Sequence, residues 1–285
     1  MFNYILYRVG EFLTLYLPFK LDFFLARIIS TFQYLLSSAD RTSVRNNLRV
    51  IFPDIDRRLL ERYTRGVFIN FGRYLTVFFK SRKSGPGFFR KNVAVEGREN
   101  IDKALSLGRG AIILSAHVGN WELGGMAMGL LGYPMNAVTL THKHKKAEDF
   151  FNRNRESKNI KVIPLGVAVK KCLEAFSRNE IVCILGDRDF TQGGIVVDFF
   201  GRPSLIPKGP AVFYLRNKTP IVPGFTVREP SGRIRLFFSP PLEFEPSGDY
   251  EKDIRAVTGI YLRHIEDCIR KYPEQWYMFR KFWLD

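Results

Sequence analysis

Residues 110–125, with the sequence GAIILSAHVGNWELGG, decide how the chain is expected to fold. The uninterrupted apolar run 111–114 leads into Ser115, and after a Gly-Asn turn a helix is expected to begin at Trp121. A short apolar run without alternation is typical of a strand that is buried on both faces of a parallel sheet. The stretch therefore predicts a strand–turn–helix unit of an α/β protein.

Further short β-rich runs follow the same pattern, and helical stretches separate most of them. The expected strands are residues 93–95, 111–115, 136–140, 161–164, 181–185, 221–227 and 234–239. Strands that alternate with helices predict an α/β fold in which helices flank a mixed, mostly parallel sheet. We expect a single α/β domain over residues 39–285, preceded by a distinct segment over residues 1–38.

The N-terminal segment is apolar, with sparse charges, and Pro18 divides it into two helical stretches. On a helical wheel, the polar side chains of the first stretch share one side and its large apolar side chains share the other. No uncharged run reaches the ~18 apolar residues of a confident membrane span. We therefore expect two helices lying in the membrane interface. The alternatives are helices packed on the protein's own core, or a true span.

Charge and cysteine content restrict the partners that the chain can have. Among 285 residues, 44 Lys and Arg oppose 28 Asp and Glu, for a net charge of +16, which calls for an anionic partner. An aromatic content of 14% favours a lipid surface over nucleic acid. Three widely spaced cysteines indicate neither a disulfide framework nor a zinc site, so we expect no metal.

His117 and Glu122 form the candidate catalytic pair. His117 follows the strand of the 110–125 unit, and Glu122 lies in the first turn of its helix, so the carboxylate could turn back to the imidazole. It would then fix the tautomer, and the other ring nitrogen would remove a proton from a substrate hydroxyl. Gly119 and Asn120 form the turn, where Asn120 would cap the helix and free N–H groups would stabilise negative charge. The alternative is a structural strand-end histidine with a capping glutamate.

Several motifs, in order along the chain, resemble one family. HVGNWE at 117–122 is the H-x4-E motif of the lysophospholipid acyltransferase superfamily, and its flanks resemble the lipid A biosynthesis late acyltransferases of the lauroyl and myristoyl type. Similar segments are RTSVRNNLRVIFP at 41–53, LGDRDF at 185–190, VDFFGRPSLIPKGPAVFYLRNKTPIVPGF at 197–225 and PEQWYMFRKFW at 273–283. The resemblance covers essentially the whole chain.

This resemblance implies a glycerophosphate-acyltransferase-like fold and a membrane-associated O-acyltransferase. The implied reaction moves an acyl chain from a thioester of acyl carrier protein or coenzyme A to a hydroxyl of a lipid A precursor, without a cofactor. The implied place is the cytoplasmic face of the bacterial inner membrane, with its lipids as partners and no nucleic acid. Two alternatives stay open: another lipid acceptor, such as a lysophospholipid or an amino-acid lipid, or a non-catalytic basic binding protein.

The resemblance also assigns further site residues. An arginine of the family maps best to Arg155 and second to Arg153, and it could polarise the thioester carbonyl or hold a phosphate. The family's acidic residue maps to Asp187, which could position that arginine or cap a turn. Asp189 is a rival, because the chain reads D-R-D where many relatives have D-Q.

Overall fold

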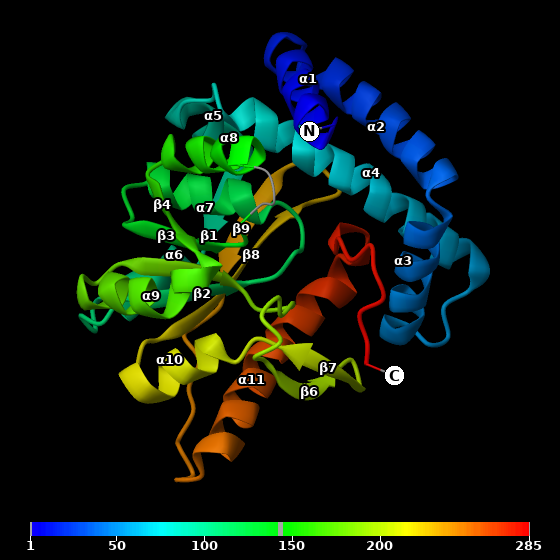
Figure 1. The fold of residues 1–285 in the computed structure, drawn as a ribbon. Helices are drawn as coiled ribbons and strands as arrows, with labels where there is room; N and C mark the ends of the chain where they lie inside the picture. The colour runs from blue at the N-terminus through cyan, green and yellow to red at the C-terminus, as the bar shows by residue number, and fades with distance from the viewer. Residues whose placement is uncertain (1, 142–144, 285) are drawn as a thin grey trace.

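The computed structural model describes residues 2–141 and 145–284. In this part of the chain, a seven-stranded sheet with the order β1-β9-β8-β2-β5-β3-β4 forms the centre of the protein (Figure 1). Its strands are β1 (Val93–Glu96), β2 (Ala111–Ser115), β3 (Met135–Thr139), β4 (Ile160–Pro164), β5 (Ile181–Leu185), β8 (Ile221–Arg228) and β9 (Ile234–Phe238).

Neighbouring strands of this sheet run parallel, except that β8 and β9 are antiparallel. β2 lies between β8 and β5, with Ile113 paired to both Val222 and Cys183. Every residue of β2 is buried, which explains its uninterrupted apolar sequence. The predicted α/β fold with a mixed, mostly parallel sheet is confirmed.

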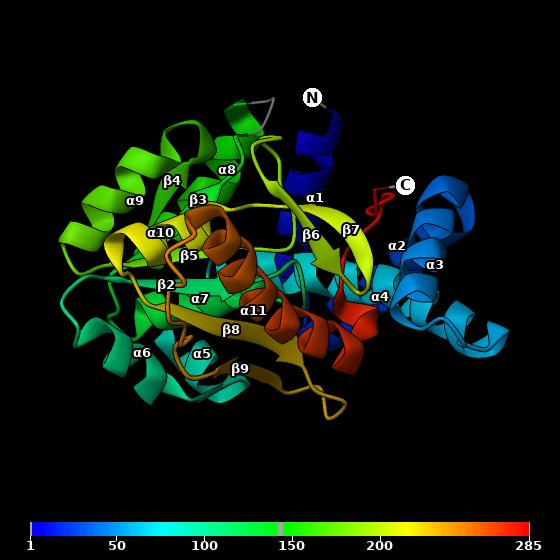
Figure 2. The same cartoon turned by 90° about the horizontal axis from the view of Figure 1, so that it is seen from below.

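Helices cover both faces of the sheet (Figure 2). Ile113 of β2 packs into a core with the helices of one face, whereas Ile112 and Leu114 pack with those of the other. The first group is α5 (Pro86–Asn92), α6 (Arg98–Leu105), α7 (Trp121–Leu130) and α8 (Lys145–Glu156). The second group is α9 (Ala168–Ser177), which follows the 3-10 turn Leu165–Val167, α10 (Gly209–Asn217) and α11 (Tyr250–Lys271), which the 3-10 turn Pro273–Gln275 follows.

A hairpin that the sequence analysis did not predict lies outside the main sheet. It consists of β6 (Ile195–Phe199) and β7 (Arg202–Ile206), which pair antiparallel, and β6 packs against α11. The connection is Phe200–Gly201, and both residues have positive φ, 54° and 72°. Tight hairpin turns of this kind usually contain Asn-Gly or Asp-Gly. The phenylalanine therefore concealed the turn.

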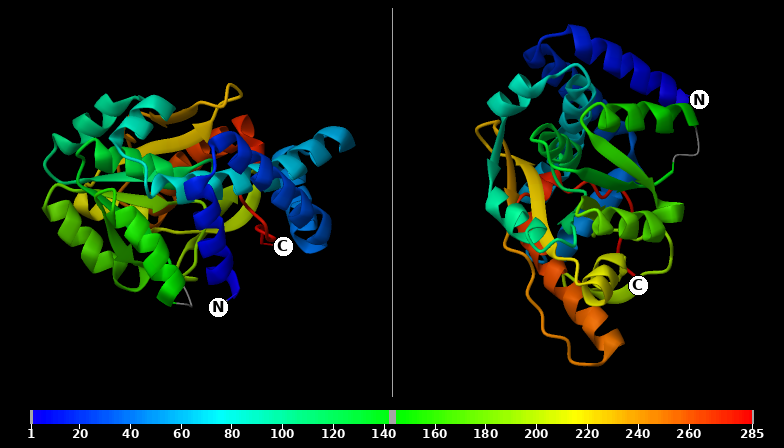
Figure 3. Two further views of the ribbon diagram at one scale, coloured as in Figure 1. Left: turned by 90° about the horizontal axis from the view of Figure 1, so that it is seen from above. Right: turned by 90° about the vertical axis from the view of Figure 1, so that its left-hand side faces the viewer.

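The N-terminal helices lie across α4 (Arg57–Ser81), on the side of the molecule away from α10 and α11 (Figures 1 and 3). They are α1 (Phe2–Tyr16) and α2 (Phe19–Leu36), with Pro18 immediately before α2, and α3 (Ser38–Ile51) follows. The predicted helix–break–helix pattern is thus confirmed. Within the described residues, no helix is both long enough and apolar enough to cross a bilayer.

The acidic residues of α1 and α2 face the protein. Glu11 is buried and forms ion pairs with Arg8 and with Arg82, and Asp22 is buried against Lys80 of α4. Many large apolar side chains are exposed instead: Val9, Phe12, Leu13, Tyr16, Leu21, Phe24, Ile28, Ile29, Phe32, Leu35 and Leu36. We call this set the outer apolar face. Both helices pack against α4, as the alternative of packing on the protein's own core expects, but the side chains of the outer apolar face do not take part in that packing.

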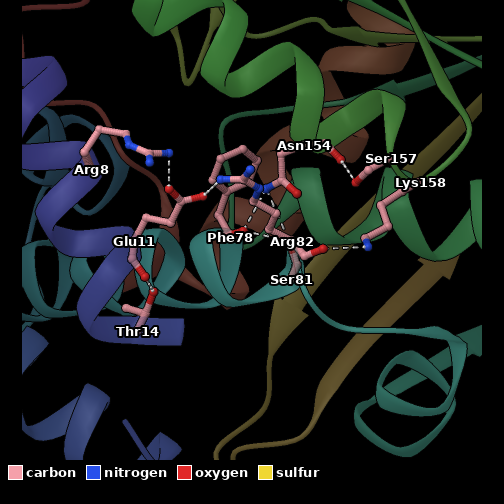
Figure 4. Close-up of polar contacts among 9 residues, drawn as sticks. All are labelled: Arg8, Glu11, Thr14, Phe78, Ser81, Arg82, Asn154, Ser157 and Lys158. Carbon is pink, nitrogen blue, oxygen red and sulfur yellow. Dashed lines mark hydrogen bonds and ion pairs between the residues drawn. The ribbon is translucent and has the colours of Figure 1, made fainter. Parts of the chain in front are cut away.

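The end of α4 connects α1 with α8, as Figure 4 shows. The guanidinium of Arg82 binds Glu11 of α1. The backbone carbonyl of Arg82 accepts a 3.2 Å hydrogen bond from Nζ of Lys158. Nδ2 of Asn154, on α8, donates to the carbonyl of Phe78 at 2.9 Å. These bonds fix the C-terminal part of α8, which carries the candidate arginine of the site.

Candidate active site

His117 and Asp187 meet at one edge of the sheet because β2 and β5 are parallel neighbours. Ser115 pairs with Leu185, so the residues two positions beyond each strand end lie side by side. Nδ1 of His117 is 2.8 Å from Oδ1 of Asp187, and the backbone N–H of His117 donates to Oδ2 at 3.1 Å. Asp187 is completely buried.

The protonation state of this pair follows from its surroundings. Burial alone would raise the pKa of Asp187, but His117, Arg188 and a hydrogen bond from Trp276 together hold it well below its usual value. An ionised carboxylate can only accept hydrogen bonds, so Nδ1 of His117 is the donor, and in the neutral imidazole Nε2 then carries the lone pair. His117 is therefore arranged to act as a base through Nε2.

Glu122 does not contact the imidazole, which corrects the predicted pair. Its carboxylate binds the guanidinium of Arg155, with Nε–Oε2 at 3.0 Å and Nη2–Oε1 at 2.6 Å. Both side chains are only 10% exposed, and Nη1 of Arg155 donates to Asn152. Burial would lower the pKa of Arg155, but Glu122 raises it, so the guanidinium stays charged. Glu122 binds Arg155 and not His117 because a buried guanidinium requires a counter-charge, which Glu122 supplies from the first turn of α7.

The structure also separates the rival residues. Arg155 is buried on α8 and borders the cavity described below, whereas Arg153 is exposed. Asp187 binds His117, whereas Asp189 accepts hydrogen bonds from its own loop, at Thr191 and Gly194. The expectation that Asp187 positions Arg155 is wrong, since Glu122 does so.

Gly119 and Asn120 have structural roles. Their N–H groups donate to the carbonyls of Gln275 and Thr226, at 2.8 and 2.7 Å, and are not free to stabilise negative charge as expected. The side chain of Asn120 caps α7 by accepting from the N–H of Leu123 at 3.1 Å, as predicted. Gly119 has φ +64°, and a Cβ there would lie 1.9 Å from the carbonyl oxygen of Thr226. The loop is thus fitted tightly against β8.

Trp276 is a site residue that the analysis of the sequence did not single out. Its indole Nε1 donates to Oδ2 of Asp187 at 3.1 Å, and the next residue, Tyr277, donates its N–H to the carbonyl of His117. The C-terminal segment therefore holds both members of the His–Asp pair. The one signal for this contact was the resemblance carried by PEQW at 273–276.

His117 lines a cavity of about 780 Å³, whose other lining residues come from both sides of the sheet. Arg155 and Glu122 border it, and the rest of its wall is predominantly apolar. On the α7 side, the wall includes Gly125, Met128, Met135 and Ile160; on the α9 side, it includes Val169, Cys172, Val212 and Phe213. Cavities of this size and character accept apolar ligands. A base thus faces a space that suits a hydrocarbon chain.

Comparison with known proteins identifies related chains. A phosphatidylinositol mannoside acyltransferase of Mycobacterium tuberculosis is 30% identical over 197 residues, which are 67% of this chain and 60% of that protein. The corresponding protein of Mycolicibacterium smegmatis is 25% identical over 257 residues, 88% of this chain and 82% of its own length. The lipid A biosynthesis palmitoleoyltransferase of Escherichia coli is 25% identical over 276 residues, 93% of this chain and 86% of its own length.

The match with the M. tuberculosis protein leaves two fifths of that relative unmatched, since it spans 60% of the relative's length. The family model for bacterial lipid A biosynthesis acyltransferases matches residues 2–285. The relatives and the family are named as acyltransferases, which confirms the resemblance found in the sequence. This chain belongs to the bacterial lipid A biosynthesis acyltransferase family.

Proposed function

We propose that this chain is a membrane-associated O-acyltransferase, which transfers a fatty acyl chain from a thioester to a hydroxyl of a lipid acceptor. The observation that carries the proposal is the Asp187–His117 pair, which presents Nε2 beside a largely apolar cavity of about 780 Å³. A base next to a hydrocarbon-sized space suits the deprotonation of an alcohol close to a bound acyl group.

In the proposed reaction, Nε2 of His117 takes the proton of the acceptor hydroxyl while its oxygen attacks the thioester carbonyl carbon. The carbon–sulfur bond then breaks, and the proton passes from His117 to the departing thiolate. Asp187 stabilises the imidazolium that forms between these steps. Arg155, held by Glu122, supplies positive charge at the cavity wall for the developing oxyanion. The reaction requires no cofactor besides the thioester donor.

The acceptor that we propose is a phosphorylated glycolipid, with a lipid A precursor as the first candidate. The E. coli relative is named for lipid A biosynthesis, and the mycobacterial relatives for phosphatidylinositol mannosides. The second candidate acceptor is therefore a phosphatidylinositol mannoside, favoured by the 30% identity with the M. tuberculosis protein. As donor we propose a thioester of acyl carrier protein, with coenzyme A as the alternative carrier.

The outer apolar face supports membrane association. A water-soluble helix normally turns its apolar side inward, but α1 and α2 turn the acidic residues Glu11 and Asp22 inward and leave many aromatic and aliphatic side chains outside. We propose that this face enters the interface of the cytoplasmic leaflet of a bacterial inner membrane, where the net charge of +16 would attract anionic lipids. The lipid acceptor would then reach the cavity from the bilayer.

The test is an assay with purified protein, thioesters of several chain lengths, and the two glycolipid acceptors, with products identified by mass spectrometry. We expect one acceptor to gain the mass of an acyl group, and His117→Ala to lose roughly two to four orders of magnitude in rate. A non-catalytic binding protein would form no product. If His117→Ala were as active as the wild type, the proposed base would be wrong.

A further inference from the structure

Arg188 lies beside the catalytic pair, and the proposed reaction does not use it. It follows Asp187 directly and lines the same cavity as His117. Its Nη2 donates to the carbonyl of Tyr277 at 3.1 Å and contacts Sδ of Met278, whereas its Nε is buried and has no hydrogen-bond partner. A buried guanidinium donor without a partner is costly, so this one calls for an explanation.

A second guanidinium group lies close to that of Arg188. The guanidinium carbons of Arg188 and Arg280 lie 5.8 and 5.3 Å from the ring centroid of Phe190, which is 6.4 Å from the ring centroid of His117. Lys208 lines the same cavity. Burial lowers the pKa of Arg188, the charge of Asp187 opposes this, and the like charge of Arg280 lowers the pKa further.

Nearby carboxylates do not compensate these cations fully. The oxygens of Asp187 are engaged by His117 and Trp276, and those of Asp189 by the N–H and hydroxyl groups of its own loop. In the part of the chain that the structure describes, neither Arg188 nor Arg280 forms a salt bridge. The cluster therefore retains capacity for an anion.

We propose that Arg188, with Arg280 close to it, forms a subsite for a phosphate group of a substrate. A guanidinium fork matches phosphate oxygens, and Nε of Arg188 gives the subsite a donor that is already desolvated. The inference rests on the proposed function, because the phosphate would place the acceptor hydroxyl next to His117.

Two substrates could supply the phosphate, and a kinetic experiment distinguishes them. One arm compares a disaccharide lipid acceptor with its dephosphorylated form; the other compares lauroyl-coenzyme A with the phosphate-free thioester S-lauroyl-N-acetylcysteamine. We expect Arg188→Gln to raise KM about tenfold for the phosphorylated acceptor, and to leave KM for the dephosphorylated acceptor and both donors unchanged. An increase restricted to lauroyl-coenzyme A would support the subsite but assign it to the donor. Equal effects on both members of each pair would overturn it.

Controls separate the loss of charge from general damage. Arg188→Lys should recover part of the effect, and Arg280→Gln should show a smaller increase of the same kind. Arg216→Gln is the matched control, since this arginine also lies over an aromatic ring, that of Tyr250, but does not line the cavity. Equal KM effects of Arg216→Gln and Arg188→Gln would contradict the subsite.

A binding measurement keeps this proposal separate from the proposed reaction. His117→Ala protein is titrated with micelles containing phosphatidic acid, and with micelles containing diacylglycerol. We expect tighter binding to micelles with phosphatidic acid. The additional change Arg188→Gln should reduce the ratio of the two affinities about tenfold. If the wild type forms no acylated product but this preference is seen, the proposed reaction fails and the subsite stands. If no such preference is seen, the subsite fails.

Discussion

Nδ1 of His117 lies 2.8 Å from Oδ1 of Asp187, although 70 residues separate the two in sequence. The glutamate only five residues after His117 is bound elsewhere, in a buried ion pair with Arg155. The site thus contains two carboxylates with different functions. Asp187 controls the proton of the imidazole, and Glu122 neutralises and orients a guanidinium.

The role of Asp187 predicts a large effect for a nearly isosteric change. In Asp187→Asn, the amide can no longer hold an ionised acceptor at Nδ1, so the imidazolium is not stabilised and the other tautomer becomes accessible. We expect kcat for acyl transfer to fall roughly 10²–10⁴-fold, with a small change in KM. Asp198→Asn on the exposed side of β6 is the control and should leave kcat unchanged. Wild-type kcat in Asp187→Asn would contradict this role.

The Glu122–Arg155 pair predicts a loss of stability as well as of activity. Glu122→Gln would leave the Arg155 guanidinium buried without a counter-charge, so the free energy of unfolding should fall by about 3–5 kcal/mol. Replacing both charges, in Glu122→Leu with Arg155→Met, should restore much of that stability, because an apolar pair of similar volume tolerates burial. Urea unfolding measures both effects.

The same double variant tests whether the pair takes part in the reaction. We expect it to fold well and yet to stay far below wild-type kcat, because the cavity wall has lost its positive charge. Recovery of kcat together with stability would show that the pair serves the fold alone.

The strands of the main sheet were predictable because local sequence determines them, whereas the partner of His117 was not. Ala111–Ser115 is buried on both faces, and its apolar run shows this directly. That β5 lies next to β2, and so brings Asp187 to His117, depends on the strand order of the sheet, which a single sequence does not reveal. The short spacing between His117 and Glu122 favoured a contact between these two residues. Glu122 instead neutralises the buried charge of Arg155, which lies on another helix.

The orientation of α1 and α2 could not be predicted from the wheel either. A helical wheel separates the charged side from the apolar side, but it does not show which side meets the protein. Lys80 and Arg82, at the end of α4, attract the acidic residues Asp22 and Glu11 inward, and this leaves the outer apolar face exposed. Lys80 lies 58 positions after Asp22, and Arg82 lies 71 positions after Glu11, so neither contact can be read from the helices themselves.

The outer apolar face predicts binding to lipid bilayers. Replacing both Phe24 and Phe32, which are 58% and 59% exposed, by aspartate should weaken binding to phosphatidylglycerol-containing vesicles more than tenfold. Burying one such ring in an apolar medium contributes about 1.5–3 kcal/mol, and the added charges oppose insertion. Cosedimentation with vesicles measures this binding. Leu107→Asp, at a 51% exposed leucine away from these helices, should leave it unchanged. Equal weakening by Leu107→Asp would contradict a specific membrane face.

Two adjacent glycines of α7 test the course of the acyl chain. A Cβ on Gly125 would lie 3.5 Å from Cδ1 of Ile160, an ordinary contact, whereas a Cβ on Gly124 would lie 2.0 Å from Oγ1 of the buried Thr226. We therefore expect Gly125→Ala to be tolerated and Gly124→Ala to destabilise the fold by about 1–3 kcal/mol, measured by thermal or urea unfolding. These variants establish which position has room for a side chain.

Gly125→Leu then places that side chain in the cavity. If the acyl chain lies along α7, the shorter cavity should favour shorter donors, and the ratio of kcat/KM for ten-carbon over fourteen-carbon thioesters should rise at least tenfold. Gly125→Ala provides the reference with the same backbone and a nearly full cavity. An unchanged ratio in a folded Gly125→Leu protein would place the chain on the α9 side instead, where Val212 would be the residue to enlarge.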